Sequence, residues 1–179
     1  MLLKPLQFQI PALFLGRVER KPGEFNPGNF AQFSVNGNLI EFDNASIRSD
    51  VAEMSPYLVK GFVLPSRSAA KMGFRPMEVA ELKGDELAQV WGQCEIARDD
   101  FEDKNLSRRS ILRVVACGLN LRVEVNPDSD AFQLPGLYHV RFDLVAVTKW
   151  NDSAKKNLIV WELSNPTLYE PTRRVKKDE

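Results

Sequence analysis

The run Pro135-Gly136-Leu137-Tyr138-His139-Val140-Arg141-Phe142-Asp143-Leu144 is the most informative stretch of this chain. A Pro-Gly turn signal opens a segment in which apolar and polar residues alternate, which predicts a strand with one buried face. The strand is expected to continue to Thr148, and a second run returns from Leu158 to Leu163. Turn residues at Asn151-Asp152-Ser153 separate the two runs, so we expect a hairpin with Trp150 near its tip.

Short apolar runs elsewhere in the chain also predict strands, and their close spacing is typical of a barrel or sandwich. Asn36-Gly37 favours a tight hairpin between two of them, because both residues tolerate a positive φ. Apolar residues from Val79 to Trp91 follow an imperfect helical spacing, which predicts one helix over about 78–91. No internal repeat is visible. The predicted strands are 8–18, 30–35, 39–42, 59–65, 94–101, 111–116, 119–125, 138–148 and 158–163, and 66–76 is predicted to be a basic loop.

Bulk composition predicts one soluble domain. The chain has 179 residues, of which 44% are hydrophobic, so it can bury a core and is expected to form a single domain over 1–171. Its 24 Lys and Arg balance 24 Asp and Glu, so a positively charged site requires local clustering. No run approaches the roughly 18 apolar residues of a membrane span, and the start lacks a secretory pattern, which predicts a cytoplasmic protein. The charged segment 172–179 is expected to be a flexible tail.

Motifs for catalysis and metal binding are missing from the sequence. His139 is the single histidine, and Cys94 and Cys117 form no CxxC pair, so the usual zinc sites are excluded. Phosphate-binding glycine loops and the GxSxG motif are also missing. The acidic run 99–103 is interpreted as a solvated loop, with a carboxylate metal site as the alternative. We therefore expect no enzyme activity, no cofactor and no metal.

Cations beside aromatic rings are the chemistry that the chain does offer. Single-stranded nucleic acids are bound by cations along the phosphates and by flat rings on which bases stack. An exposed Trp150 would forgo the energy of burial, so it is expected either to stack on bases or to pack against the domain or a protein partner. The candidate nucleic-acid contacts are Lys149, Trp150, Lys155 and Lys156 in the C-terminal hairpin, Arg17, Arg20, Lys21, Phe25 and Phe30 around the first turn, and Arg67, Lys71, Phe74 and Arg75 in the middle loop.

From Leu119 onward the order of features resembles the single-stranded DNA-binding proteins of filamentous phages, the gene V type. The shared order is a strand at 121–125, a linker, the Pro135-Gly136-Leu137-Tyr138 turn, a strand, a hairpin ending near Trp150, and a returning strand. The segment Gly16-Arg17-Val18, with its turn into a second strand, also resembles the opening hairpin of OB-fold single-strand binders. Residues 43–110 have no counterpart in the small phage proteins.

This resemblance implies a mainly β fold, an OB-like five-stranded barrel, enlarged by an inserted helix and extra strands and loops over about 43–110. It implies a non-catalytic protein that binds single-stranded DNA with little sequence preference and protects or organises it in phage or plasmid replication. The implied partners are single-stranded DNA, a second copy in a homodimer and replication proteins, in the cytoplasm of a bacterial host. It also implies that Trp150 contacts DNA and that Tyr138 is structural.

Two other functions fit the sequence. Zero net charge favours a protein-interaction or assembly module without nucleic-acid binding, because many nucleic-acid binders are basic. An RNA-binding or nuclease-associated β-domain is the third possibility. The segment 43–110 is expected either to cover a sheet edge or to add a DNA contact through Arg67, Lys71 and Arg75.

Overall fold

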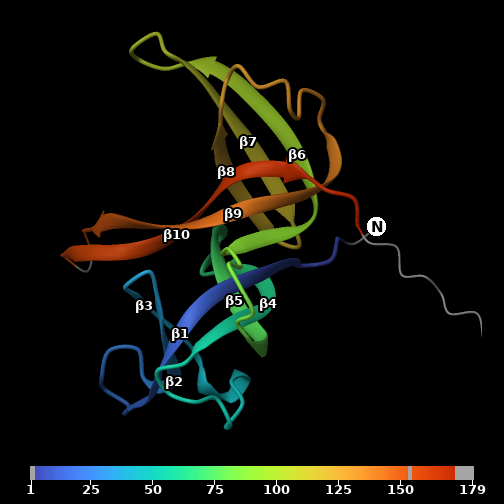
Figure 1. Cartoon of the computed structure of the whole chain (residues 1–179). Coiled ribbons are helices and arrows are strands. Elements are labelled where there is room, and N and C mark those ends of the chain that lie inside the picture. Colours follow the sequence, from blue (N-terminus) through green and yellow to red (C-terminus); the bar gives the residue numbers. More distant parts are fainter. Residues whose placement is uncertain (1–2, 153–154, 172–179) are drawn as a thin grey trace, which may run out of the picture.

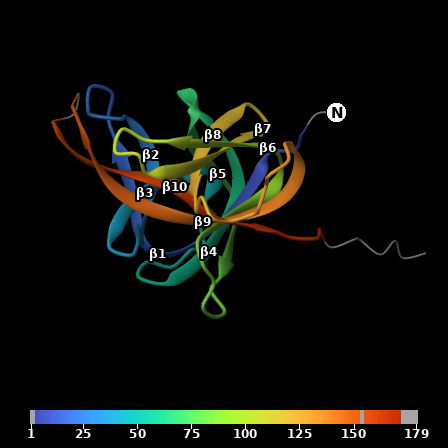
Figure 2. The same cartoon turned by 90° about the horizontal axis from the view of Figure 1, so that it is seen from above.

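Ten β-strands and one short 3-10 helix make up the computed structural model, which describes residues 3–152 and 155–171 (Figure 1). All ten strands belong to one open sheet, which coils on itself when seen from above (Figure 2). Six strands follow the order β10-β9-β6-β1-β2-β3, and the other four attach beside them. The elements are β1 (Leu6–Arg20), β2 (Gly28–Val35), β3 (Asn38–Asp43), η1 (Asn44–Ser46), β4 (Pro56–Ser66), β5 (Ser68–Glu81), β6 (Gln89–Glu102), β7 (Arg108–Ala116), β8 (Leu119–Val125), β9 (Gly136–Asn151) and β10 (Lys156–Leu168).

Two long strands, β1 and β6, connect the sheet because each of them changes partners along its length. β1 pairs with β4 over 6–13 and with β2 over 13–20. β6 pairs with β9 over 89–96 and with β7 over 95–102. Each long strand therefore holds two hairpins, β2–β3 and β4–β5 on β1, and β7–β8 and β9–β10 on β6.

The two halves of the chain thus follow the same plan of pairing, although the sequence shows no repeat. We call 6–81 the first unit and 89–168 the second unit. Their equivalent hairpins turn through two residues, Asn36-Gly37 in the first and Cys117-Gly118 in the second. All four of these residues have a positive φ, which is the geometry of the tightest hairpin turns. The structure therefore contains a repeat that the sequence analysis missed.

A tyrosine occupies the same place in both units and holds a loop against its strand. The Tyr57 hydroxyl of β4 accepts a hydrogen bond from the backbone N–H of Ala52 at 2.8 Å. The Tyr138 hydroxyl of β9 donates one to the Leu134 carbonyl at 2.6 Å. Each bond fixes the connection that enters the strand, which gives Tyr138 a structural role.

The starts of β1 and β6 pair with each other and join the two units. When the strand registers of the two units are matched from their equivalent turns, Phe8 of β1 corresponds to Val90 of β6. These two residues are direct partners. On either side, Gln7 pairs with Trp91, and Gln9 pairs with the glutamine that begins β6. Antiparallel pairing at equivalent positions is what a two-fold axis produces, so the units meet as two copies in a dimer would.

At the centre of each unit, a phenylalanine on one strand lies opposite a smaller residue on the paired strand. Phe8 lies opposite Gly61 of β4, whereas Val90 lies opposite Phe142 of β9. Both phenylalanines and Val90 are fully buried. A Cβ at Gly61 would lie 1.9 Å from the Arg75 carbonyl oxygen, so the close approach of β5 requires glycine here.

The helix predicted over 78–91 is wrong, because the described residues contain no α-helix. Residues 78–81 end β5, 82–88 form a connection, and 89–91 begin β6. Val79 and Val90 are buried as strand residues, whereas Leu87 between them is 62% exposed. The spacing that indicated a helix combines the ends of two strands. Among the described residues, no helix is long and apolar enough to span a membrane.

The predicted OB-like five-stranded barrel is also wrong, since the sheet is open and has ten strands. β1 pairs with β6 of the second unit in addition to β2 and β4, so the first unit continues into the second instead of closing. The segment 43–110, expected to be an insertion, supplies β4, β5 and β6. Most of the predicted loop 66–76 is strand β5. The predicted tail 172–179 lies outside the described residues, and the single domain over 1–171 stays a prediction.

Replacing Gly61 by alanine tests the packing at the crossing of β1, β4 and β5. We expect Gly61→Ala to lower the free energy of unfolding by about 3 kcal/mol, because the added carbon overlaps the β5 backbone. Urea unfolding followed by tryptophan fluorescence measures the change. Gly84→Ala is the matched control, because its Cβ would meet only the Glu86 carboxylate at 3.8 Å. Equal stability of the two variants would contradict this packing.

Candidate nucleic-acid interface

The β9–β10 hairpin extends beyond the rest of the sheet and carries Trp150 near its tip (Figure 1). Trp150 lies opposite Asn157 and is 59% exposed. Its indole Nε1 donates a hydrogen bond to Asp152 Oδ1 at 2.9 Å. The ring is therefore not packed into the core of this chain, and its exposed area is accessible to a ligand.

The three lysines of this hairpin have different surroundings. Lys149 forms an ion pair with Glu162 of β10, which neutralises its charge locally. Lys155 and Lys156 are exposed, and no acidic side chain among the described residues pairs with them. Lys156 Nζ lies 5.6 Å from the centre of the Phe25 ring, a cation–π contact. Two of the three predicted lysines are thus available to a phosphate.

The connection between β1 and β2, residues 21–27, supplies the second exposed ring of this region. Phe25 is 85% exposed, and Lys21 in the same loop is exposed as well. The contact between Phe25 and Lys156 joins this loop to the β9–β10 hairpin. The structure therefore brings two of the three predicted segments together. We call Lys21, Phe25, Trp150, Lys155 and Lys156 the arm surface.

Arg17 and Arg20, also predicted contacts, are engaged inside the first unit. The Arg20 guanidinium donates two hydrogen bonds of 2.5 Å to Glu41 and lies 5.2 Å from the Phe30 ring centre. These hydrogen bonds hold the pKa of the Glu41 carboxyl below its usual value. Arg17 donates to the Asn44 side chain at 2.6 Å and to the Arg48 carbonyl at 2.5 Å. Arg17, Arg20 and Phe30 therefore have structural roles within the first unit, which leaves them less available to a ligand.

The residues of the third predicted segment, the middle loop, have two kinds of surroundings: the cations are on the β4–β5 hairpin surface and the phenylalanine is at the core. Arg67 occupies the β4–β5 turn with a φ of 59°, and Lys71 and Arg75 are exposed on β5. Phe74 points inward, where its ring lies 5.1 Å from Phe8 and 6.1 Å from Trp161, centre to centre. The cations remain candidates for phosphate, whereas Phe74 packs against the core.

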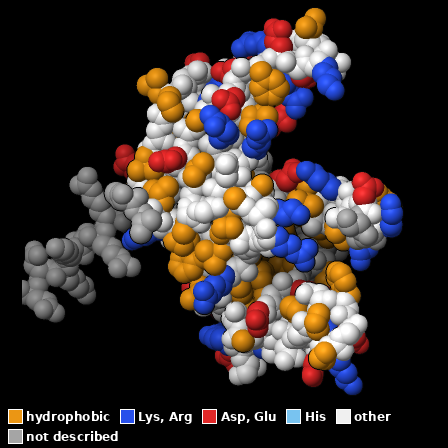
Figure 3. All heavy atoms as spheres, turned by 180° about the vertical axis from the view of Figure 1, so that it is seen from behind, with side chains coloured by type: hydrophobic (Ala, Val, Ile, Leu, Met, Phe, Trp, Pro, Cys, Tyr) orange, Lys and Arg blue, Asp and Glu red, His pale blue; other side chains and the backbone are white. Residues whose placement is uncertain are grey.

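A cleft of about 270 Å³ opens between β3, β5 and β10, at the base of the β9–β10 hairpin. Figure 3 shows this hollow between the projecting β9–β10 hairpin and the part of the molecule that contains β2 and β3, with hydrophobic side chains inside. The lining residues are Leu39, Ile40, Glu41 and Phe42 from β3, Met72, Gly73 and Phe74 from β5, and Ile159 and Trp161 from β10. Of these, only Phe74 is among the candidate residues predicted from the sequence. The alternation of β10 was the missed signal, because it places Ile159 and Trp161 on the same hairpin face as Trp150.

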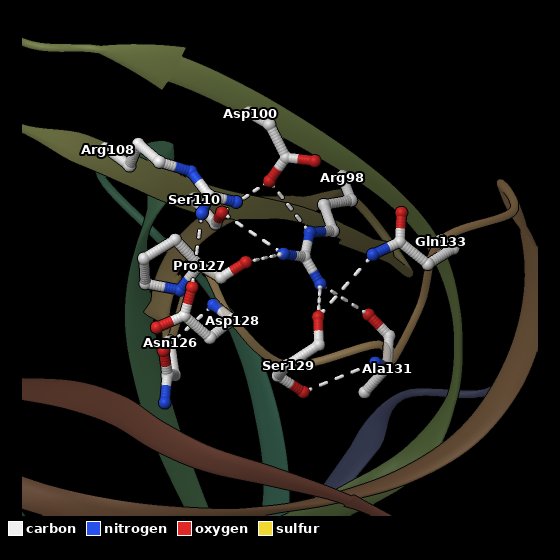
Figure 4. Close-up of polar contacts among 10 residues, drawn as sticks. All are labelled: Arg98, Asp100, Arg108, Ser110, Asn126, Pro127, Asp128, Ser129, Ala131 and Gln133. Atoms are coloured by element: carbon white, nitrogen blue, oxygen red, sulfur yellow. Dashed lines mark hydrogen bonds and ion pairs between the residues drawn. The ribbon is translucent and has the colours of Figure 1, made fainter.

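Arg98 is the centre of a cluster of polar contacts in the second unit (Figure 4). Its side chain is only 2% exposed, and it pairs with Asp100 at 2.9 Å. Its nitrogens also donate to Ser110 Oγ and to the carbonyls of Pro127, Ser129 and Ala131. Hydrogen bonds from Ser110 and Arg98 lower the pKa of Asp100. Arg98 therefore fixes the β8–β9 connection to β6, which is a structural role.

The remaining acidic, histidine and cysteine side chains that the structure describes have separate surroundings. The acidic run 99–103 is not the predicted loop, because its first four residues lie on β6, where Asp99 pairs with Arg113 of β7 at 3.0 Å. Among the described residues, no group of three or more His, Cys, Asp and Glu could hold a metal ion. His139 packs against the Tyr169 ring at 5.8 Å. Burial raises the pKa of the Cys94 thiol to about 12, so this thiol stays protonated.

Comparisons of the chain with protein-family models, curated proteins and solved structures found no match. The resemblance to phage single-strand binders therefore stays a prediction, and functional arguments depend on the geometry of the arm surface and the cleft.

Removing Arg98 tests its role as the anchor of the β8–β9 connection. We expect Arg98→Met to lower the free energy of unfolding by about 3 kcal/mol, because the carbonyls of Pro127, Ser129 and Ala131 and the Ser110 hydroxyl lose the donor that the buried guanidinium supplies. Arg113→Met, which breaks a half-exposed ion pair, should cost less than about 1 kcal/mol. Chemical unfolding at neutral pH compares the two. Similar losses in both variants would contradict the assigned role.

Proposed function

We propose that the protein binds single-stranded DNA with little sequence preference through the arm surface and does not catalyse a reaction. The observation that carries this proposal is the contact between Lys156 and Phe25, which joins the hairpin of Trp150 to the loop of Lys21. Two exposed rings and three lysines thereby lie on two neighbouring segments of a molecule whose formal net charge is zero. Rings for stacking and cations for phosphates are the two groups that single-strand binding requires.

The charge of the arm surface sets how strongly salt should oppose binding. Lys21, Lys155 and Lys156 have no acidic partner among the described side chains, and Lys71 lies on β5 beside the cleft. Arg20 and Lys149 contribute less, because Glu41 and Glu162 already neutralise them. These four lysines can therefore neutralise about four phosphates, fewer than the nine candidate cations that the sequence offers.

The cellular role is the further part of the proposal. The resemblance of 119–163 to phage binders favours protection or organisation of single-stranded DNA during phage or plasmid replication, in a bacterial cytoplasm. Replication proteins and a second copy are the partners that this role implies. Among the described strands β10 pairs with β9 alone, so its second edge is one that another copy can extend.

A protein-interaction module is the second candidate, and the unpaired edge of β3 favours it. β3 pairs only with β2, and an extended peptide can add to such an edge. A stoichiometric protein partner that copurifies without nucleic acid would support this candidate. Equal affinity for oligo-U and oligo-dT would instead support an RNA-binding domain.

Fluorescence titration with oligo-dT at several salt concentrations tests the proposed function. We expect the logarithm of the association constant to fall with the logarithm of salt concentration with a slope of about −3, from about four neutralised phosphates. Trp150→Ala should weaken binding by about 1–3 kcal/mol, the contribution of one stacked base.

Phe101→Ala is the matched control for Trp150→Ala. Phe101 is an exposed ring, 45% accessible, at the end of β6. This variant should bind oligo-dT as tightly as the wild-type protein. The proposal is wrong if wild-type protein does not bind oligo-dT at low salt, or if both variants lose the same affinity.

A further inference from the structure

The cleft between β3, β5 and β10 lies where the two units, otherwise related by an internal two-fold axis, differ in packing. In the second unit, the β7–β8 turn packs against the β4–β5 hairpin, with Pro65 Cγ 3.1 Å from the Cβ position of Gly118. The equivalent turn in the first unit ends at Gly37, whose Cβ position has nothing within 4 Å. The β9–β10 hairpin therefore does not pack against the β2–β3 turn. The space between the β4–β5 hairpin and the β7–β8 turn is closed, whereas the equivalent space between the β9–β10 hairpin and the β2–β3 turn is open.

The walls of the cleft suit a flat ring with a polar edge. Phe74 and Trp161 meet edge to face at 6.1 Å, and Leu39 at the opposite wall is 50% exposed. β3 forms that wall with its unpaired edge, where outward backbone N–H and C=O groups can donate and accept hydrogen bonds. The Glu41 carboxylate is the one ionised side chain of the lining, and Arg20 holds it in an ion pair.

Trp150 of the arm surface and the cleft share one face of the β9–β10 hairpin, whereas Lys156, which pairs with Asn151, belongs to the other face. Directly paired residues of antiparallel strands point to the same face. Trp150 pairs with Asn157, Thr148 with Ile159, and Ala146 with Trp161. Trp150 therefore lies at the outer end of the face whose inner end lines the cleft.

We infer that the cleft receives one unstacked base of the bound single strand. This inference rests on the proposed function. The base ring lies against Trp161 and Phe74, and its polar edge faces the backbone of β3. The adjoining phosphates lie toward Lys156 on one side and Lys71 on the other. A nucleic acid is favoured over a peptide because Lys71 beside the cleft and Lys156 on the hairpin form no described ion pair and can meet phosphates.

Comparison of oligo-dT with an abasic deoxyribose-phosphate oligomer of equal length tests the inference, because only oligo-dT offers bases. Trp161→Leu should lower the affinity for oligo-dT about tenfold, a loss within the range for one stacked base, and leave the affinity for the abasic oligomer unchanged. Leu39→Ser should act in the same way. Since Leu39 is half exposed on an edge strand, this second variant keeps the test valid if Trp161→Leu folds poorly.

Val160→Ala is the control, because Val160 pairs with Val147 on the opposite face of the hairpin and should change neither affinity. Wild-type affinity for oligo-dT in Trp161→Leu and Leu39→Ser, with weaker binding by Trp150→Ala, would overturn the cleft inference and leave the proposed function standing. Failure of the wild-type protein to bind oligo-dT would overturn both. Protection of β3 from amide exchange by an extended apolar peptide, but not by oligo-dT, would assign the cleft to a protein.

Discussion

The pairing of β1 with β6 around Phe8 and Val90 is the contact on which the rest of this structure depends. Each of these strands also holds two hairpins, so their contact joins two five-stranded units into one sheet. The buried side chains of both units form one continuous core across this line. Gly61 permits β5 to approach Phe8 there. A change at this crossing is therefore expected to affect both units.

Repetition of one plan makes the differences between the units informative. The β4–β5 hairpin packs against the β7–β8 turn, but the equivalent β9–β10 hairpin stands clear of the β2–β3 turn. Trp150 and the lysines beside it lie on the hairpin that stands clear. Exposure of a large aromatic ring gives up the energy of burial, which favours a role in binding. The open cleft and the exposed ring are two consequences of the same asymmetry.

Local sequence patterns predicted the strands well and the long-range arrangement poorly. Every run predicted as a strand lies within an observed one, because alternation and the Asn36-Gly37 turn are local signals. β5 was missed, since its small and charged residues and Pro76 suit an edge strand with a bulge rather than an alternating pattern. The partners of β1 and β6 are far apart in sequence, so the barrel was predicted where an open sheet formed. The exposed Trp150 and the lysines near it were identified from sequence, whereas the ion pairs of Arg20 and Lys149 and the cleft around Trp161 depend on register and packing.

Hydrogen–deuterium exchange of the full chain with and without oligo-dT tests the central claim most directly, namely that one end of this sheet binds a single strand. The account predicts slower exchange in 21–27, 39–42 and 149–161 when oligo-dT is bound. It also predicts no change in the β6–β7 connection around 103–107, which lies at the top of the molecule in Figure 1, above the β9–β10 hairpin. Protection confined to 103–107, or no protection at any oligo-dT concentration, would contradict the account.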